Sequence, residues 1–228
     1  MTKTGRQRMT PEAIIDAALN ISRMDDGQTP DRVTGASLGK ALSVDRSAVW
    51  RHFADKDALL IACGDRLLAS VVEAAEREAD PWARLVAIFH GILGEFRRYP
   101  LLAVDSMALP LTGPNWRRLV EVAITALGDL GLSPDAGARY LRVFIELTTS
   151  YAATVATFEA RPEALREEEY RAMSAELYSL DPGEYPHLAA TGPFLATVSQ
   201  DHVTTMIIGA FRVLLDGARE PGSWLEGT

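Results

Sequence analysis

Apolar residues recur every three to four positions along most of the chain, which is the spacing of a helical face, and convincing strand patterns are missing. We therefore predict an all-α fold. A polar side chain followed by proline marks several helix starts, as at Thr10-Pro11, Asp80-Pro81 and Ser133-Pro134. Helices are expected at about 10–24, 34–42, 46–53, 55–78, 80–96, 100–110, 114–127, 133–160, 162–180 and 201–217. The stretch 181–199 is expected to be a loop, and residues after 219 to be frayed.

The stretch 38–60 has the pattern of a helix-turn-helix, in which two short helices cross at a sharp angle. Gly39 is small where the two helices must approach closely. Apolar residues at helical spacing are expected to hold the crossing angle, namely Leu38, Leu42, Val44, Val49 and Phe53. The alternative interpretation is a generic helical hairpin whose charged face is only solvated.

The outward face of the helix over 46–53 carries side chains that suit DNA. Arginine can donate two hydrogen bonds to guanine, serine pairs with several base edges, and an alanine methyl can meet that of thymine. Base contacts are therefore predicted for Arg46, Ser47, Ala48 and Arg51. Phosphate contacts are predicted for Thr34, Trp50, His52 and Lys56.

The distribution of charge decides whether DNA binding is plausible, because the net charge of −8 alone argues against it. Residues 1–60 contain nine Lys and Arg against eight Asp and Glu, a net charge of +1, which leaves −9 for the remainder. A locally basic N-terminal region can contact phosphates while the acidic remainder stays off the DNA.

These motifs resemble the DNA-binding region of the TetR family of bacterial transcriptional regulators. The resemblance rests on the order and spacing of four segments, which are Leu38-Gly39, Ser43-Val44, Trp50-Arg51-His52-Phe53 and Lys56-Asp57-Ala58-Leu59-Leu60. Gly39 stands where the family usually has alanine, Ser43 where it has the turn glycine, and Trp50 where it has tyrosine. If the turn needs a positive φ, Ser43 makes it less relaxed than glycine would.

The C-terminal region resembles the tetracycline-repressor type of ligand domain, through residues 184–190 and 209–217. Together the two resemblances imply a DNA-binding domain over 1–55, with a flexible basic arm at 1–9, and a helical ligand-binding and dimerisation domain over 56–220. They further imply a homodimer that binds palindromic double-stranded DNA and responds to a small-molecule effector, most simply as a repressor in the cytoplasm.

The helices over 133–160 and 201–217 have little polar surface, and such helices are buried or lie in an interface. The resemblance implies that they pair with their copies in a dimer. The interface residues expected there are Leu141, Ile145, Ala152, Val155, Met206, Ala210, Val213 and Leu214.

A ligand pocket is expected between the helices of the second domain. Its candidate lining residues are Phe89, His90, Leu93, Met107, Trp116, Leu119, Phe144, Thr148 and Tyr151. For each apolar residue a place in the core is the competing interpretation, and for His90 a structural role is the default.

Other functional classes find little support in the sequence. The pair Glu184-x-x-His187 has the spacing of a di-iron ligand motif, but proline interrupts it and no second copy exists. We expect no cofactor, no metal site and no enzymatic activity. The single cysteine, Cys63, is expected to be a buried thiol, and no apolar run reaches the roughly 18–20 residues that a membrane span needs. The alternative function is an all-helical binding or enzymatic module without DNA binding.

Overall fold

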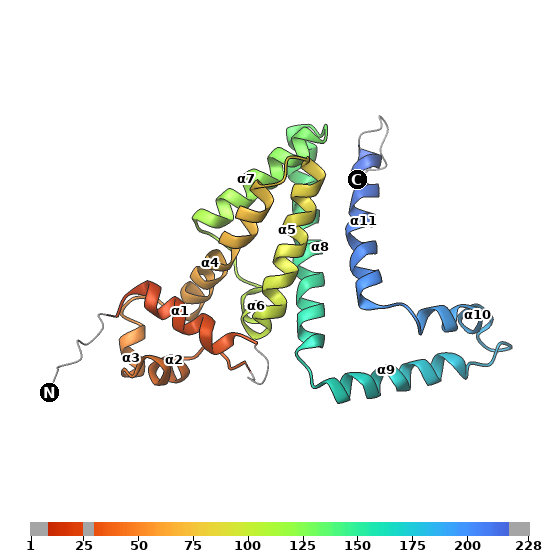
Figure 1. Cartoon of the computed structure of the whole chain (residues 1–228), viewed down its shortest axis with the longest axis horizontal. Helices are drawn as coiled ribbons and strands as arrows, with labels where there is room; N and C mark the ends of the chain where they lie inside the picture. The colour runs from red at the N-terminus through yellow and green to blue at the C-terminus, as the bar shows by residue number, and fades with distance from the viewer. Residues whose placement is uncertain (1–8, 25–29, 219–228) are drawn as a thin grey trace.

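The computed structural model of the chain describes residues 9–24 and 30–218. These residues form helices and no strands, which confirms the predicted all-α class. The helices, shown in Figure 1, are α1 (Pro11–Ser22), α2 (Gly35–Leu42), α3 (Arg46–Val49), α4 (Lys56–Glu76), α5 (Pro81–Arg98), α6 (Pro100–Ser106), α7 (Pro114–Asp129), α8 (Pro134–Glu159), α9 (Glu163–Tyr178), α10 (Pro186–Leu195) and α11 (Gln200–Ala218). Most of the predicted basic arm, and the residues predicted to be frayed after 219, lie outside the described part.

The predicted helix starts are confirmed by hydrogen bonds from the first turn to the capping side chain. Thr10 accepts one from the Ala13 N–H at 3.2 Å, and Asp80 accepts one from the Ala83 N–H at 2.8 Å. Asp55 caps α4 in the same way. Each bond satisfies one of the N–H groups that a helix start leaves without a partner.

The predicted helices over 46–53 and 100–110 are too long, since α6 ends at Ser106, and the predicted loop over 181–199 is wrong in type. The helix expected over 46–53 ends at Val49, because the next backbone bonds, from Arg51 to Ala48 and from His52 to Val49, span three residues instead of four. The loop expected over 181–199 contains α10. Pro186 was interpreted as a helix breaker, but it occupies the first turn of α10, where proline needs no N–H partner.

Two hydrophobic cores lie one above the other along α4. The N-terminal core joins α1, α2 and α3 to the start of α4 and to α6, and it includes Leu38, Val49, Leu59 and Leu102. The second core joins the later part of α4 to α5, α7, α8 and α11. Because α4 belongs to both cores, a shift of this helix must change the side-chain packing in each of them.

The last three helices leave the bundle and return to it. In Figure 1, α9 and α10 extend away from the lower end of α8, and α11 comes back beside α8. The rings of Phe144 and Phe211 pack with centroids 4.9 Å apart, and the Tyr151 hydroxyl hydrogen-bonds with that of Thr204 at 2.5 Å. Helix α9 has no buried residue, so it contributes little to either core. None of the described helices combines the length and apolar character needed to cross a membrane.

Candidate DNA interface and ligand cavity

The turn between α2 and α3 is tight and needs a left-handed residue. Ser43 adopts φ 53° and ψ 44°, and the next N–H, that of Val44, donates to the Gly39 carbonyl at 2.9 Å. A Cβ added at Gly39 would lie 3.0 Å from the Val44 carbonyl oxygen. The predicted close approach at Gly39 and the positive φ at Ser43 are thus both present.

Three of the predicted base-contacting residues lie on α3, and the fourth, Arg51, follows its end. Arg46, Ser47 and Arg51 are exposed, and Ala48 is half-buried. Asp45 caps α3 by accepting bonds from the N–H of Ser47 at 2.8 Å and from its hydroxyl at 2.5 Å. These two bonds lower the pKa of Asp45, and they also engage the Ser47 hydroxyl, which must be released or shared before it can meet a base.

The predicted phosphate-contacting residues surround α3. Thr34 and His52 are exposed, and Thr34 caps α2 in a reciprocal capping box with Ser37. The Trp50 indole nitrogen would lie 3.0 Å from a Cβ added at Gly35, so the ring packs on the first turn of α2. Thr34, Trp50 and His52 thus lie beside α2 and α3, around the helix that carries the base-contacting candidates.

Lys56, the remaining phosphate candidate, is already paired. Its Nζ lies 2.7 Å from Oδ2 of Asp105 at the end of α6, and Arg32 pairs with the other carboxylate oxygen. Partial burial raises the pKa of Asp105, but the hydrogen bond and charge of Lys56 and the charge of Arg32 outweigh it and leave the pKa below its ordinary value. Sequence reasoning missed Asp105, because nothing local marks a contact across 49 residues.

A second polar contact joins α4 to α7. Gly113 precedes α7 with a φ of 143° and offers no capping side chain, and Asp65 of α4 takes over that role. The Asp65 Oδ1 accepts from the Trp116 N–H at 2.8 Å, and its Oδ2 accepts from the Asn115 side chain at 3.2 Å. A Cβ at Gly113 would lie 2.3 Å from the Asp65 carboxylate, so this contact requires glycine. It fixes α7, and with it Trp116, to the middle of α4.

A cavity of about 540 Å³ lies between α4, α5, α6, the segment after α6, α7 and α8. Its wall is mainly apolar and aromatic and includes Leu67, Phe96, Tyr99, Leu111 and Trp116. A smaller apolar space of about 60 Å³ shares part of this wall, including Leu68, Phe96 and Trp116. The combined space has the size and lining of a small-molecule site.

Four of the nine predicted pocket residues line these spaces, which are Met107, Trp116, Leu119 and Phe144. The other five lie elsewhere. Phe89 and Leu93 are buried in the second core. Thr148 is buried on α8, and its hydroxyl has no hydrogen-bond partner among the described residues. Tyr151 faces α11, and His90 is exposed with its ring edge against Phe89.

Glu95 is a cavity residue that sequence reasoning missed. It lines the larger cavity, its side chain is 17% exposed, and its Oε2 is buried without a hydrogen-bond partner among the described residues. The available signal was a single carboxylate in the stretch 85–96, whose other side chains are apolar apart from that of His90.

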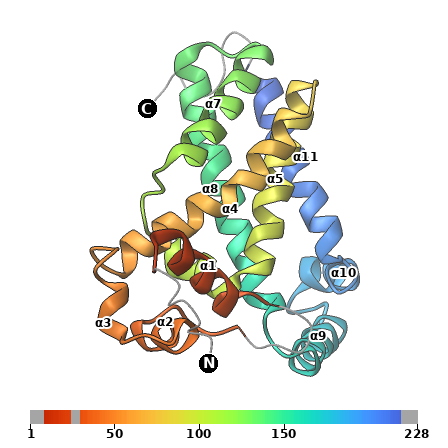
Figure 2. The same cartoon turned by 60° about the vertical axis from the view of Figure 1, so that its left-hand side comes forward.

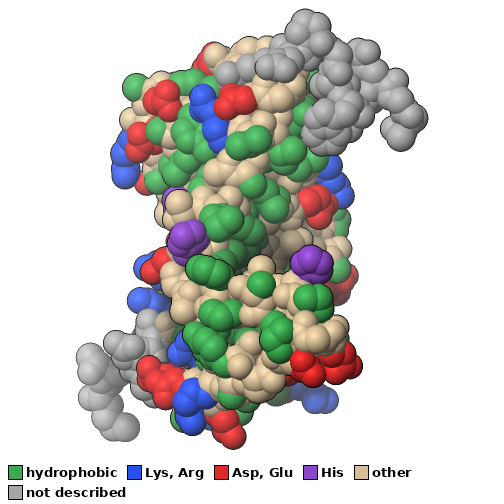
Figure 3. All heavy atoms as spheres, turned by 90° about the vertical axis from the view of Figure 1, so that its right-hand side faces the viewer, with side chains coloured by type: hydrophobic (Ala, Val, Ile, Leu, Met, Phe, Trp, Pro, Cys, Tyr) green, Lys and Arg blue, Asp and Glu red, His purple; other side chains and the backbone are tan. Residues whose placement is uncertain are grey.

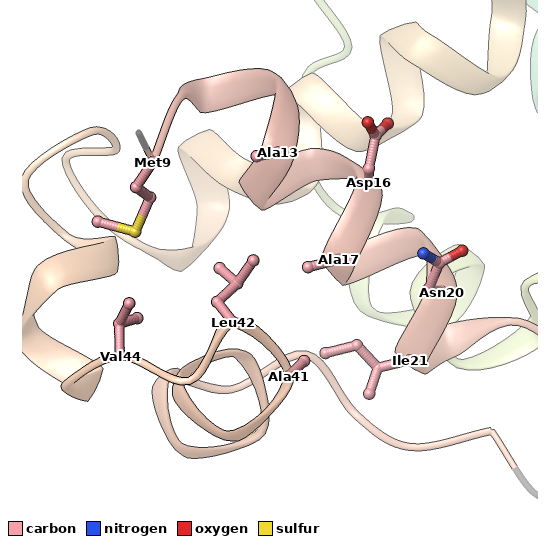
Figure 4. A pocket seen from close by; sticks show the side chains of 9 residues that line it. All are labelled: Met9, Ala13, Asp16, Ala17, Asn20, Ile21, Ala41, Leu42 and Val44. Atoms are coloured by element: carbon pink, nitrogen blue, oxygen red, sulfur yellow. The ribbon is translucent and has the colours of Figure 1, made fainter. Parts of the chain in front are cut away.

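A further groove lies on the surface of the N-terminal domain. Its volume is about 610 Å³. Figure 4 shows the lining side chains, which come from α1, from the end of α2 and from the adjoining residues Met9 and Val44. It has no aromatic side chain, and only Asp16 and Asn20 bring side-chain polar groups. The cavity between α4 and α8 is the better ligand site of the two, since ligand sites are lined mainly by apolar and aromatic side chains.

The predicted interface residues divide between exposed and buried positions. Met206 and Val213 on α11 are 60% and 72% exposed, and Ala210 is exposed beside them. Figure 3 shows hydrophobic side chains spread over the face that carries α9, α10 and α11. Leu141, Ile145 and Leu214 are half-buried, whereas Ala152 and Val155 are buried within the chain itself.

Comparisons with known proteins agree with this architecture. Residues 75–220 match the family model described as tetracyclin repressor-like, C-terminal domain. No curated protein matches the chain.

Solved structures resemble the chain over nearly its whole length. A possible TetR family transcriptional regulator of Streptomyces coelicolor A3(2) is 25% identical, covers 92% of this chain and 98% of its own, and superposes with a TM-score of 0.70. The TetR family protein ActR of Streptomyces coelicolor, in complex with actinorhodin, is 20% identical. The match covers 92% of this chain and 97% of ActR, with a TM-score of 0.78. A TetR variant of Acinetobacter baumannii AYE, in complex with minocycline, is 20% identical. The match covers 91% of this chain and 98% of that protein, with a TM-score of 0.60.

Proposed function

The chain belongs to the TetR family of transcriptional regulators, and from this premise we propose that it is a homodimeric repressor that binds a palindromic operator and is released by a small-molecule effector. The observation that carries the proposal is the course of α4. This helix begins directly after the helix-turn-helix, packs in the N-terminal core, and continues as a wall of the ligand cavity.

DNA binding is supported by the surface that the tight turn presents. Arg46 and Arg51 are exposed on either side of the buried anchor Val49. Their side chains are long enough to enter the major groove while Val49 holds the short helix to the domain. Lys56 would contact a phosphate only by giving up or sharing its bond to Asp105. The proposed site of action, on operator DNA, places the protein in the cytoplasm.

Dimerisation is supported by the apolar surface of α11. One side of this helix, with Ile208, Phe211 and Leu215, is buried against the second core. The opposite side leaves the side chains of Met206 and Val213 exposed to solvent. Burying these apolar side chains against a partner would lower the free energy of the dimer. A symmetric dimer would place two α3 helices roughly 34–36 Å or slightly more apart, which predicts a palindromic operator.

The effector is proposed to bind the cavity between α4 and α8. The cavity wall includes Leu67 of α4 and Leu102 of α6, and both residues also pack in or against the N-terminal core. A ligand that fits better when these helices shift would favour a dimer whose two DNA-binding domains are wrongly spaced for the operator. Such a ligand acts only through its preference for that state, which a full switch requires to be several kcal/mol.

The test is binding of the purified chain to duplex DNA from the region upstream of its neighbouring gene, at two salt concentrations. The proposal predicts a sequence-selective complex that weakens as salt rises, because Lys and Arg contacts to phosphates release counterions. A chain that forms no selective, salt-sensitive complex with that DNA would refute the proposal in favour of a helical module without DNA binding.

A further inference from the structure

The cavity wall contains one largely buried carboxylate, that of Glu95, whose hydrogen bonds are incomplete. Glu95 Oε1 accepts a bond from the Ser70 hydroxyl at 3.1 Å, and its distance to the Arg98 guanidinium is 4.0 Å, too long for a hydrogen bond. Oε2 is buried and has no partner among the described residues. An ionised carboxylate left in this state is costly, and native structures usually supply the missing donor.

The other charged residues of the cavity wall do not compensate Glu95. Arg142 and Glu146 also line the cavity, but they form an ion pair with each other one helical turn apart on α8. Their side chains are 78% and 56% exposed, so solvent screens them, whereas that of Glu95 is 17% exposed. Glu95 is therefore the least exposed charge of the cavity wall, and its ion pair with Arg98, at 4.0 Å through Oε1, leaves Oε2 without a hydrogen bond from the described residues.

The aromatic side chains of the same wall favour a positive ligand as well. Phe96, Tyr99 and Trp116 line the cavity with Glu95, and aromatic ring faces attract cations. The terminal torsion of a glutamate is broad, so the carboxylate can turn one oxygen toward a ligand while Ser70 keeps the other. A ligand with a nitrogen donor near Glu95 would supply the missing hydrogen bond.

We propose that the cavity selects an amphiphilic amine, with an apolar body against Phe96 and Trp116 and a protonated nitrogen that donates to Glu95. The proposal rests on the proposed function, because it names the chemical class of the effector. Anionic compounds are disfavoured by Glu95, and neutral compounds of the same shape leave its carboxylate unsatisfied.

The experiment compares three probes that share one tricyclic body and differ in charge. These are 9-aminoacridine as the cation, acridone as the neutral compound and acridine-9-carboxylate as the anion. Binding to the full chain without DNA is followed by fluorescence titration at neutral pH. The proposal predicts that the cation binds about tenfold or more tightly than either of the others, as expected for a hydrogen bond to a charged group.

The matched variants are Glu95→Gln and Glu73→Gln. The first removes the charge and keeps the shape of the side chain, and is expected to weaken 9-aminoacridine binding by about 10- to 100-fold, with acridone changed by no more than about twofold. The second removes the same charge from the outer face of α4, where Glu73 is 61% exposed and does not line the cavity. A purely structural role of Glu95 would affect the three probes alike.

The proposal is overturned if the neutral or anionic probe binds as tightly as the cation, if the two variants behave alike, or if none of the three probes binds. Operator binding by the unaltered chain, measured separately, distinguishes this failure from failure of the proposed function. A chain that binds DNA but does not prefer the cation refutes the ligand class alone. A chain that prefers the cation through Glu95 but binds no DNA refutes the proposed function alone.

Discussion

The Nζ of Lys56 lies 2.7 Å from Oδ2 of Asp105. This contact joins the first residue of α4 to the last turn of α6, and Arg32, just before α2, pairs with the same carboxylate. The Asp105 side chain is only 11% exposed, so the pair of cations is held at the boundary between the N-terminal core and the ligand cavity. A ligand that moves α6 would therefore act directly on two basic residues that flank the helix-turn-helix.

Replacing Asp105 tests the strength of this junction. Asp105→Asn is expected to lower the free energy of unfolding at neutral pH by about 1 kcal/mol, because it removes a partly buried carboxylate from two cations that remain half-exposed. Urea unfolding measures the difference. Asp129→Asn, which removes a 52% exposed carboxylate paired with Arg84, is the control and should cost less.

The same substitution predicts a pH dependence with a definite sign. The pKa of Asp105 is lower in the folded chain than its ordinary value of 3.8, so its stabilisation is fully present above pH 3.8 and is lost as pH falls through the lower, folded pKa. The stability difference between the unaltered chain and Asp105→Asn should thus be constant from pH 7 to about pH 5 and shrink below pH 4. A difference that grows on acidification would contradict this account.

Ser43 carries backbone strain that glycine would relieve. A non-glycine residue in the left-handed region costs roughly 1–2 kcal/mol, part of which glycine gives back through its greater freedom in the unfolded chain. Ser43→Gly is therefore expected to raise the free energy of unfolding by about 0.5–1 kcal/mol. Thermal or urea unfolding measures it, and Ser43→Ala, which keeps the Cβ, should give no gain. Equal stability of all three chains would show that the turn is relaxed.

The exposed face of α11 is expected to hold the dimer together. Val213→Glu places a charge at a position that is 72% exposed in the single chain, so folding should be preserved while association is lost. Sedimentation velocity should show a dimer for the unaltered chain and a monomer for the variant. Val104→Glu, at a 41% exposed valine of α6, is the control and should remain dimeric. A dimer that survives Val213→Glu would place the interface elsewhere.

Much of the fold follows from short-range signals in the sequence. Several helix starts could be predicted because a capping side chain bonds to an N–H group only three residues away. The structure contains these bonds at Thr10, Asp55, Asp80 and Ser133. Helix α10 was missed, and a loop was expected in its place, because proline is compatible with a helix start as well as with a break. Local signals did not decide between the two.

The cavity was less predictable, because helical periodicity shows which residues are apolar but not whether they face a core or a void. Phe89 and Phe144 have the same pattern, yet only Phe144 reaches a cavity wall. Asp105 and Glu95 gain their significance from partners, or from a missing partner, on other helices. Such relationships are set by the packing angle of long helices, which no short window of sequence specifies.

The central claim, that α3 and its turn bind DNA bases, is tested most directly by fluorescence anisotropy with an upstream duplex at fixed salt. The account predicts that Arg46→Ala and Arg51→Ala each weaken binding by about 1–3 kcal/mol with unfolding curves unchanged, because each removes a base contact and no core packing. Arg171→Ala, the same substitution on the exposed face of α9, should bind as the unaltered chain does. If all three folded variants bind the duplex with the affinity of the unaltered chain, α3 does not contact the bases and the account is contradicted.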